Sequence, residues 1–222
     1  MLDFSNNLTA ALVLLPAGYL IGSIPFGAIL GRLHGVDLRK VGSGNVGATN
    51  VARVLGRRWG YLCFLLDMLK GLGPALAATF LLRPPEGAPP PARQAIWVGV
   101  GCAAVCGHVF SPWLGFRGGK GVSTALGMVL GIWPYFTLAG LVAGAVWVAV
   151  TLASRYVSLG SVTAGGAFLA CFAALNRGRL GELWPMALFA AAVVALIVVR
   201  HRGNIRRLLA GTENKIGPKQ PR

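Results

Sequence analysis

Charged residues are scarce in this 222-residue sequence, and acidic residues are the scarcest of them. Only 12% of the residues are charged, and six Asp and Glu stand against 21 Lys and Arg, which gives a formal net charge of +15. About a quarter of an ordinary soluble domain is charged, so the sequence lacks the polar surface of a water-soluble fold. We therefore expect lipid to surround much of the chain, which argues against nucleic acid as a partner despite the basic balance.

Signals for metal binding and for a removable leader are also missing. The four cysteines fall inside apolar stretches, with no CxxC pair and no loop histidine beside them. Such positions predict small packing residues and no metal site. No positively charged segment precedes the first apolar stretch, so we expect that stretch to remain as a helix.

The sequence is rich in apolar residues, which make up 55% of it and form runs of helical length. The runs lie near residues 8–31, 59–82, 94–114, 121–136, 137–153, 157–175 and 183–200. Residues 121–153 as one helix would be about 50 Å long against a hydrocarbon core of about 30 Å, so we place a break at Trp133-Pro134. The sequence predicts an all-α integral membrane protein, with about seven transmembrane helices in a single polytopic domain over residues 1–222.

The distribution of basic residues predicts the orientation of these helices. Seven crossings place sixteen Lys and Arg on one side and four on the other, with Lys70 inside a helix, whereas six crossings divide them ten and ten. Cytoplasmic loops carry the excess of Lys and Arg. We therefore expect seven crossings, an outside N-terminus, a cytoplasmic C-terminus and a basic cytoplasmic tail at 201–222.

A first polar segment, residues 37–58, is rich in glycine. Gly42, Gly44 and Gly47 allow the backbone to approach a ligand closely. Exposed N–H groups in such a loop, followed by a helix N-terminus, suit a phosphate. The spacing also matches the dinucleotide pattern GxGxxG, but no predicted β-strand precedes it, so we do not expect a nucleotide.

A second polar segment, residues 107–124, places Lys120 between glycines just before an expected helix. It is not a P-loop, because Leu114 stands where the first glycine is required and Gly121 stands where Ser or Thr should follow the lysine. Backbone donors, a positive helix end and a mobile ammonium instead predict a cradle for an anion. The simpler alternative is a basic loop that contacts lipid headgroups.

A third polar segment, residues 200–213, follows the last apolar run and shares the predicted cytoplasmic side with the other two. His201 and Asn204 are three residues apart and could share a helical face toward a site. A basic run at this position is equally well explained as a topology and lipid signal. Ser158 and Ser161 add hydroxyl groups on the same side, although serine near a helix end is often a cap.

Two opposite charges, Asp67 and Lys70, stand three residues apart inside the second apolar run. An unpaired charge there would be costly, so we interpret them as a structural ion pair. A transporter for a phosphorylated anion would also use a basic vestibule, but its polar residues should continue through the membrane. Apart from Arg200 at the end of the last run, these two residues are the only charges within the apolar runs, which disfavours that alternative.

Four ordered motifs, at residues 42–50, 67–74, 107–122 and 201–205, occur together over nearly the whole chain. In this combination the sequence resembles the bacterial membrane acyl-phosphate:glycerol-3-phosphate acyltransferases, the PlsY type. The resemblance implies transfer of the acyl group of a long-chain acyl phosphate to the 1-hydroxyl of glycerol 3-phosphate, giving lysophosphatidic acid and inorganic phosphate in phospholipid biosynthesis. It implies no cofactor, a multi-pass location in the bacterial cytoplasmic (inner) membrane, and an active site facing the cytoplasm. It assigns no oligomeric state.

The resemblance and the local chemistry together assign the site residues. The expected catalytic residues, around the glycerol phosphate, are Ser43, Arg53, Lys120, His201 and Asn204. The expected substrate-binding residues, including the cradle for the acyl phosphate, are Gly42, Gly44, Asn45, Gly47, Thr49, Asn50, His108, Gly118, Gly119, Gly121, Ser158 and Ser161. An acyl phosphate is already activated, so no covalent nucleophile is required. Either His201 or a phosphate oxygen of the substrate could take the proton of the attacking hydroxyl.

Overall fold

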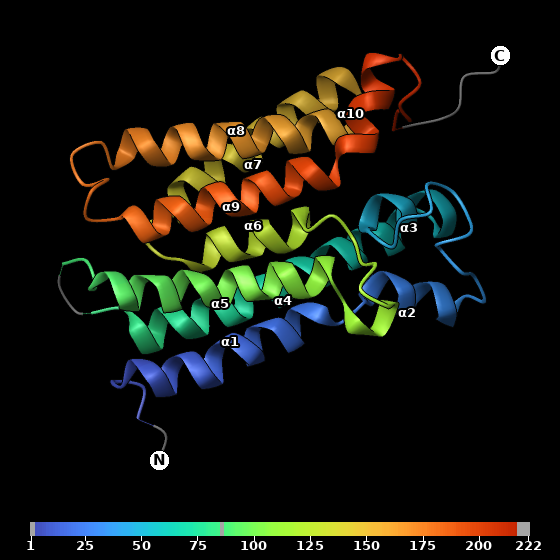
Figure 1. Ribbon diagram of the computed structural model, residues 1–222. Helices are drawn as coiled ribbons and strands as arrows, with labels where there is room; N and C mark the ends of the chain where they lie inside the picture. The colour runs from blue at the N-terminus through green and yellow to red at the C-terminus, as the bar shows by residue number, and fades with distance from the viewer. Residues whose placement is uncertain (1–2, 85–86, 217–222) are drawn as a thin grey trace.

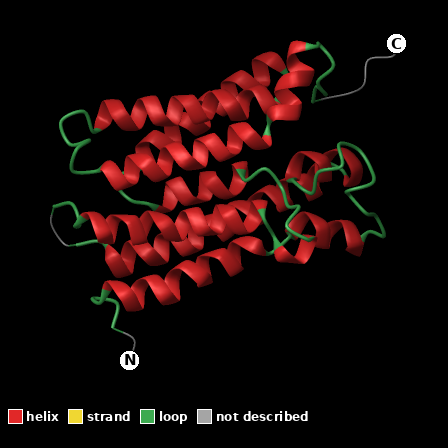
Figure 2. Ribbon diagram, in the orientation of Figure 1, coloured by secondary structure: helices red, strands yellow, loops and turns green. Residues whose placement is uncertain are grey.

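The computed structural model describes residues 3–84 and 87–216, and in this part of the chain every regular element is a helix (Figures 1 and 2). The all-α prediction is therefore confirmed for these residues. Residues 217–222 of the predicted basic tail lie outside them. In chain order the elements are α1 (Asn7–Ser23), α2 (Phe26–Leu33), α3 (Ala48–Leu55), α4 (Arg57–Leu82), α5 (Pro91–Val109), a 3-10 turn (Pro112–Leu114), α6 (Val122–Gly131), α7 (Thr137–Ser154), α8 (Val157–Leu175), α9 (Trp184–Arg200) and α10 (Arg202–Leu209).

Five helical stretches of the described chain are long and apolar enough to cross a membrane, and the bent pair α9–α10 raises the number to six at most. The helix α6, expected to cross within residues 121–136, has only ten residues. At 1.5 Å per residue it covers about 15 Å, roughly half of the hydrocarbon core. A polytopic membrane fold is confirmed, whereas the seven crossings and the outside N-terminus stay predictions.

Two breaks in the helices follow from proline. The first long span bends between α1 and α2 at Ile24-Pro25, because proline has no N–H to donate and keeps the residue before it out of the helical region. The expected break at Trp133-Pro134 is confirmed, since α6 ends at Gly131 and α7 begins at Thr137.

The helices pack closely where glycine removes the side chain. One of the closest helix interfaces joins α1 to α5. A Cβ atom built on Gly22 of α1 would lie 2.1 Å from the carbonyl oxygen of Ala104, and one on Gly107 of α5 would lie 2.2 Å from that of Tyr19. Backbone therefore meets backbone along this interface, as is common between membrane helices.

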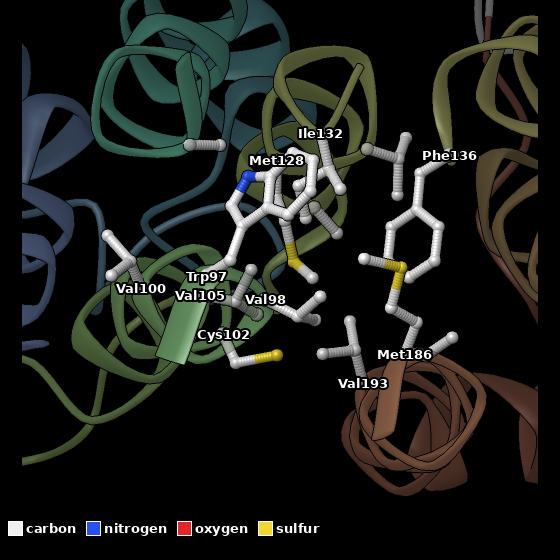
Figure 3. Packing of buried hydrophobic residues seen from close by; sticks show 14 of the residues in the cluster. Trp97, Val98, Val100, Cys102, Val105, Met128, Ile132, Phe136, Met186 and Val193 are labelled. Carbon is white, nitrogen blue, oxygen red and sulfur yellow. The ribbon is translucent and has the colours of Figure 1, made fainter. Parts of the chain in front are cut away.

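A hydrophobic core forms where α5, α6 and α9 come together. Figure 3 shows Trp97 of α5 beside Met128 of α6, with Phe136 and Met186 facing each other nearby. All four side chains are fully buried. The indole N–H of Trp97 donates a 2.9 Å hydrogen bond to Thr79 Oγ1 of α4, which satisfies a buried donor. This core fixes the relative positions of the helices whose ends carry the polar segments.

Candidate functional site

The three polar segments lie at the same end of the bundle (Figure 1). The connection from α2 to α3, the loop between α5 and α6, and the junction of α9 with α10 all occur there. Residues 83–84 and 87–90, and the connection 176–183, lie at the opposite end. Because the helices alternate in direction, segments more than a hundred positions apart in the sequence lie at the same end of the bundle.

Lys120 and Asn204 meet directly at this end. The Lys120 ammonium donates a hydrogen bond to Asn204 Oδ1. Lys120 stands two residues before α6, at the helix end that favours negative charge. Asn204 is buried in the first turn of α10, and its Nδ2 donates to Glu213 Oε1. The second and third polar segments are therefore joined through side chains.

Glu213 is the centre of a hydrogen-bond network to which the sequence analysis assigned no role. Its Oε1 accepts a 2.9 Å bond from the Ser158 hydroxyl, and its Oε2 lies 2.7 Å from Arg207 Nε. Burial raises the pKa of Glu213, but hydrogen bonds from Asn204, Arg207 and Ser158 outweigh burial and hold the pKa below its ordinary value. Glu213 is therefore a carboxylate at neutral pH. The available signal was one acidic residue standing alone inside a strongly basic tail.

Burial lowers the pKa of Lys120 to about 8. The negative charge of Glu213 opposes this shift, while the positive charges of Arg207, Arg200 and Arg53 add to it. A lysine with this pKa is mostly an ammonium at pH 7. Its charge is incompletely neutralised, so the site is prepared to receive an anion.

His201 lies at the end of α9 and is 2% exposed. Its Nδ1 is 2.8 Å from the carbonyl oxygen of Ile197. A carbonyl only accepts, so Nδ1 carries the hydrogen and Nε2 of the neutral ring is left with a free lone pair. His201 thus keeps an acceptor nitrogen that has no hydrogen bond in the described part of the chain.

The first glycine-rich loop is held in shape by Asn50, which is 1% exposed. Its Oδ1 accepts the backbone N–H of Ser43 at 2.8 Å and Arg53 Nη1 at 3.3 Å. Its Nδ2 donates to two loop carbonyls at 3.1 Å, those of Leu38 and Val41. The predicted ligand residue Asn50 therefore uses both of its polar atoms inside the protein. What it offers a substrate is the shape of the loop.

Glycine is required in this loop by its conformation and by space. Gly42 and Gly44 have φ values of 64° and 70°, in the region that side chains rarely adopt. A Cβ on Gly42 would also lie 2.2 Å from Asn50 Oδ1. The N–H groups of Gly44 and Gly47 are bonded inside the loop, to the Val41 carbonyl and to Asn45 Oδ1.

The donors that remain for an anion lie just beyond these glycines. Within residues 3–84 and 87–216, the N–H groups of Ala48 and Thr49 have no acceptor, because they belong to the first turn of α3. Ser43, Thr49 and Arg53 are exposed at the same place. In that part of the chain no hydrogen bond or ion pair joins Ser43 or Arg53 to Lys120, although the Arg53 charge acts on the Lys120 pKa.

The predicted ion pair between Asp67 and Lys70 is confirmed and has a third member. Lys70 Nζ lies 2.7 Å from Asp67 Oδ1, and each side chain is 3% exposed. His108 Nδ1 is 3.6 Å from the same carboxylate oxygen. Lys70 also donates a 2.6 Å bond to the carbonyl of Ile24, at the break between α1 and α2. His108, predicted to bind substrate, therefore lies buried at the end of α5, against Asp67 and beneath the loop that carries Lys120.

The two predicted serines have different surroundings. Ser158 belongs to the Glu213 network. The hydroxyl of Ser161 donates to the carbonyl of Val157 in its own helix and accepts from Trp147 Nε1 at 3.2 Å. Ser161 therefore joins α8 to α7, and its hydrogen bonds do not reach the other predicted site residues. A serine at a helix end does not reveal which of these situations it occupies.

Comparison with known proteins gives one consistent family. A sequence model described as Glycerol-3-phosphate acyltransferase matches residues 12–211. A protein of that description from Anaeromyxobacter dehalogenans (strain 2CP-1) is 48% identical over 214 residues, which cover 96% of this chain and 100% of the relative. Another from Aquifex aeolicus is 46% identical over 208 residues, covering 92% of this chain and 98% of the relative.

Two crystal structures described as PlsY (YgiH), an integral membrane glycerol 3-phosphate acyltransferase, have a similar fold. The glycerol 3-phosphate form is 43% identical with a TM-score of 0.80, covering 93% of this chain and 96% of that chain. The lysophosphatidic acid form is 42% identical with a TM-score of 0.78, covering 93% and 95%. The matched residues of the sequence model contain both glycine-rich loops and the junction of α9 with α10.

Proposed function

Since this chain belongs to the glycerol-3-phosphate acyltransferase family of the PlsY type, we propose that it transfers the acyl group of a long-chain acyl phosphate to the 1-hydroxyl of glycerol 3-phosphate. The products are lysophosphatidic acid and inorganic phosphate. The observation that carries the proposal is that two glycine-rich loops, one between α2 and α3 and one between α5 and α6, lie at the same end of the bundle (Figure 1). A reaction between two phosphate-bearing substrates needs two such sites.

Glycerol 3-phosphate binds at Lys120, with His201 from the end of α9 and Asn204 from the start of α10. Ser43 of the first loop and Arg53 of α3 complete the site. The Lys120 ammonium has three donors and uses one of them on Asn204, so two remain for phosphate oxygens. A bound phosphate adds negative charge beside a lysine whose pKa burial has lowered to about 8, so binding raises that pKa and keeps the ammonium charged.

The acyl phosphate headgroup binds at the first loop. Residues 42–50 give it the free N–H groups of Ala48 and Thr49 and the hydroxyl group of Thr49, in a loop whose shape Asn50 fixes. The positive end of α3 favours an anion there. The acyl chain lies between apolar helices and does not need to leave the membrane.

The reaction needs no covalent enzyme intermediate. The hydroxyl oxygen attacks the carbonyl carbon, an ester bond forms, the bond from that carbon to the phosphate oxygen breaks, and phosphate leaves with the electron pair. The proton of the hydroxyl passes to His201 Nε2 or to a phosphate oxygen. Positioning and neutralisation of charge by Lys120 and Arg53 supply most of the acceleration.

The proposed setting is the bacterial cytoplasmic membrane, with the site facing the cytoplasm. Arg53, Lys120 and the basic residues of α10 lie at the end of the bundle that carries the site, and cytoplasmic loops are the ones rich in Lys and Arg. Glycerol 3-phosphate is a charged, water-soluble substrate and enters from that side. If α6 is counted as a short crossing, the chain crosses the membrane seven times, and all three polar segments then face the cytoplasm.

The donor is tested with purified protein in detergent. The protein is given glycerol 3-phosphate together with palmitoyl phosphate, palmitoyl-CoA or palmitoyl-acyl-carrier protein, and both lysophosphatidic acid and inorganic phosphate are measured. We expect equal amounts of the two products from palmitoyl phosphate and at least a hundredfold less lysophosphatidic acid from either thioester. Faster turnover with a thioester than with palmitoyl phosphate would overturn the proposed donor.

A further inference from the structure

The glycine segment that carries Lys120 has little of its own to keep it in place. Gly118, Gly119 and Gly121 have no side chains to pack, and Gly121 adopts a φ of 84°. Glycine loses more conformational freedom on ordering than any other residue. The geometry of this segment must therefore be imposed by its neighbours.

The end of α5 provides the first set of contacts. The N–H of Gly118 donates to the Val109 carbonyl at 3.0 Å, and the N–H of Gly119 donates to the His108 carbonyl at 3.2 Å. A Cβ on Gly119 would lie 2.1 Å from His108 Nε2, so the imidazole lies directly against the glycine backbone. These contacts hold the N–H groups of the segment and leave its carbonyl groups to another partner.

Arg200, the last residue of α9, is that partner. Its Nη2 lies 3.2 Å from the Gly118 carbonyl oxygen and 3.3 Å from that of Gly119. Its Nε is buried, without a hydrogen-bond partner in the described part of the chain. The side chain thus contacts two successive carbonyls, while one of its buried N–H groups stays unpaired. Leaving a buried donor unpaired costs free energy, and an arginine that extended into solvent would not have this cost.

We propose that Arg200 is a positioning residue, which fixes the glycine segment to the end of α9 and so sets where Lys120 lies relative to His201 and Asn204. Arg200 directly precedes His201 and stands four residues before Asn204. The junction of α9 with α10 therefore carries two residues of the site together with Arg200, whose contacts to the glycine carbonyls we call the clamp. A displacement of about 1 Å in such a constellation can cost a hundredfold in rate. The catalytic consequence rests on the proposed role of Lys120.

The competing role for Arg200 is that of a basic residue beside the membrane, which any cation could fill. The two roles are separated by Arg200→Lys. Lysine keeps the charge, but its ammonium ends one bond short of Nη2 and lacks the planar group that directs this nitrogen to both carbonyls. Arg202→Lys is the matched control. Arg202 is exposed and lies two residues away, and its side chain has no hydrogen bond in the described residues.

Hydrogen exchange followed by mass spectrometry, on full-length protein in detergent, tests the clamp without using activity. We expect the amides of Gly118 and Gly119 to exchange about tenfold faster in Arg200→Lys and at the wild-type rate in Arg202→Lys. With palmitoyl phosphate and glycerol 3-phosphate, kcat/KM of Arg200→Lys should fall ten- to a hundredfold, while the Tm and the folded yield stay close to wild type.

Two results would overturn the inference, and a third would place the error in the proposed function. Wild-type exchange and activity in Arg200→Lys would show that charge alone is needed. An equal effect of Arg202→Lys on the exchange of the glycine amides would show that the contact is not specific. Faster exchange in Arg200→Lys combined with full activity of Lys120→Ala would place the error in the proposed role of Lys120, leaving the clamp without a catalytic target.

Discussion

Replacing Lys120 by alanine removes the ammonium that links the second glycine-rich loop to Asn204. Lys120 is half-buried, bonded to Asn204 Oδ1, and influenced by the charges of Glu213 and three arginines. Loss of one preorganised electrostatic group from an active site costs about 2–4 kcal/mol of transition-state stabilisation. We therefore expect kcat/KM of Lys120→Ala to fall roughly thirty- to a thousandfold, without loss of membrane insertion.

The pH dependence gives the same residue a second test. A Lys120 pKa of about 8 leaves roughly nine-tenths of the side chain as ammonium at pH 7. In the wild type, kcat/KM should therefore decline about tenfold per pH unit well above pH 8, because kcat/KM reports the free enzyme. Lys120→Arg should be only partly active, since the larger fork fits a tight loop differently, but its activity should lack this alkaline decline because the guanidinium stays charged.

Inorganic phosphate released from palmitoyl phosphate, measured with and without glycerol 3-phosphate, provides the assay. An Arg202→Ala variant serves as the control for the loss of a native basic residue at the same end of the bundle. Near-normal turnover by well-folded Lys120→Ala protein would refute the proposed site. Phosphate release that does not require glycerol 3-phosphate would recast the protein as an acyl-phosphate hydrolase.

Three further predictions follow from the same contacts. Glu213→Gln should shift the alkaline decline of kcat/KM to lower pH, because the carboxylate raises the Lys120 pKa; a shift to higher pH would contradict this. Lys70→Met should lower the folded yield on gel filtration more than the Asp67→Asn, Lys70→Met double variant does, since the single change strands a buried carboxylate; equal yields would argue against a structural pair. Reporter fusions between α7 and α8 and after α10 should both report cytoplasm, and opposite locations would refute seven crossings.

Much of the helical framework was predictable because a membrane-spanning helix needs a long run of apolar residues, and such runs are visible in the sequence. Each of the seven predicted runs contains a helix. The two helices that the runs did not include, α3 and α10, have eight residues each and carry polar groups, so their apolar faces were too short to stand out. The length of α6 was overestimated because residues 121–136 contain no charged residue, and hydropathy does not indicate where a helix ends.

The site was predictable to the level of segments and less so to the level of single side chains. Lys120 and Asn204 were predicted to act together, and they are in contact. Asn50 and His108 were predicted to face substrate, whereas their side chains hold the protein's own loops and charges. An amide or imidazole has the same donors and acceptors for a ligand as for its own backbone, so residue type alone does not distinguish these uses.

The glycine-mediated contact between α1 and α5 has a consequence for biosynthesis. The face of α1 that contains Gly22 packs against Ala104, about 80 residues later in the chain. Because synthesis proceeds at about 5–20 residues per second, α1 is in the bilayer for roughly 4–16 s before this part of α5 is made. During that interval a helix with a small-residue face is open to association with any neighbouring helix that has a similar face. Slow translation between α1 and α5 should therefore reduce the yield of correctly assembled protein even when every amino acid is unchanged.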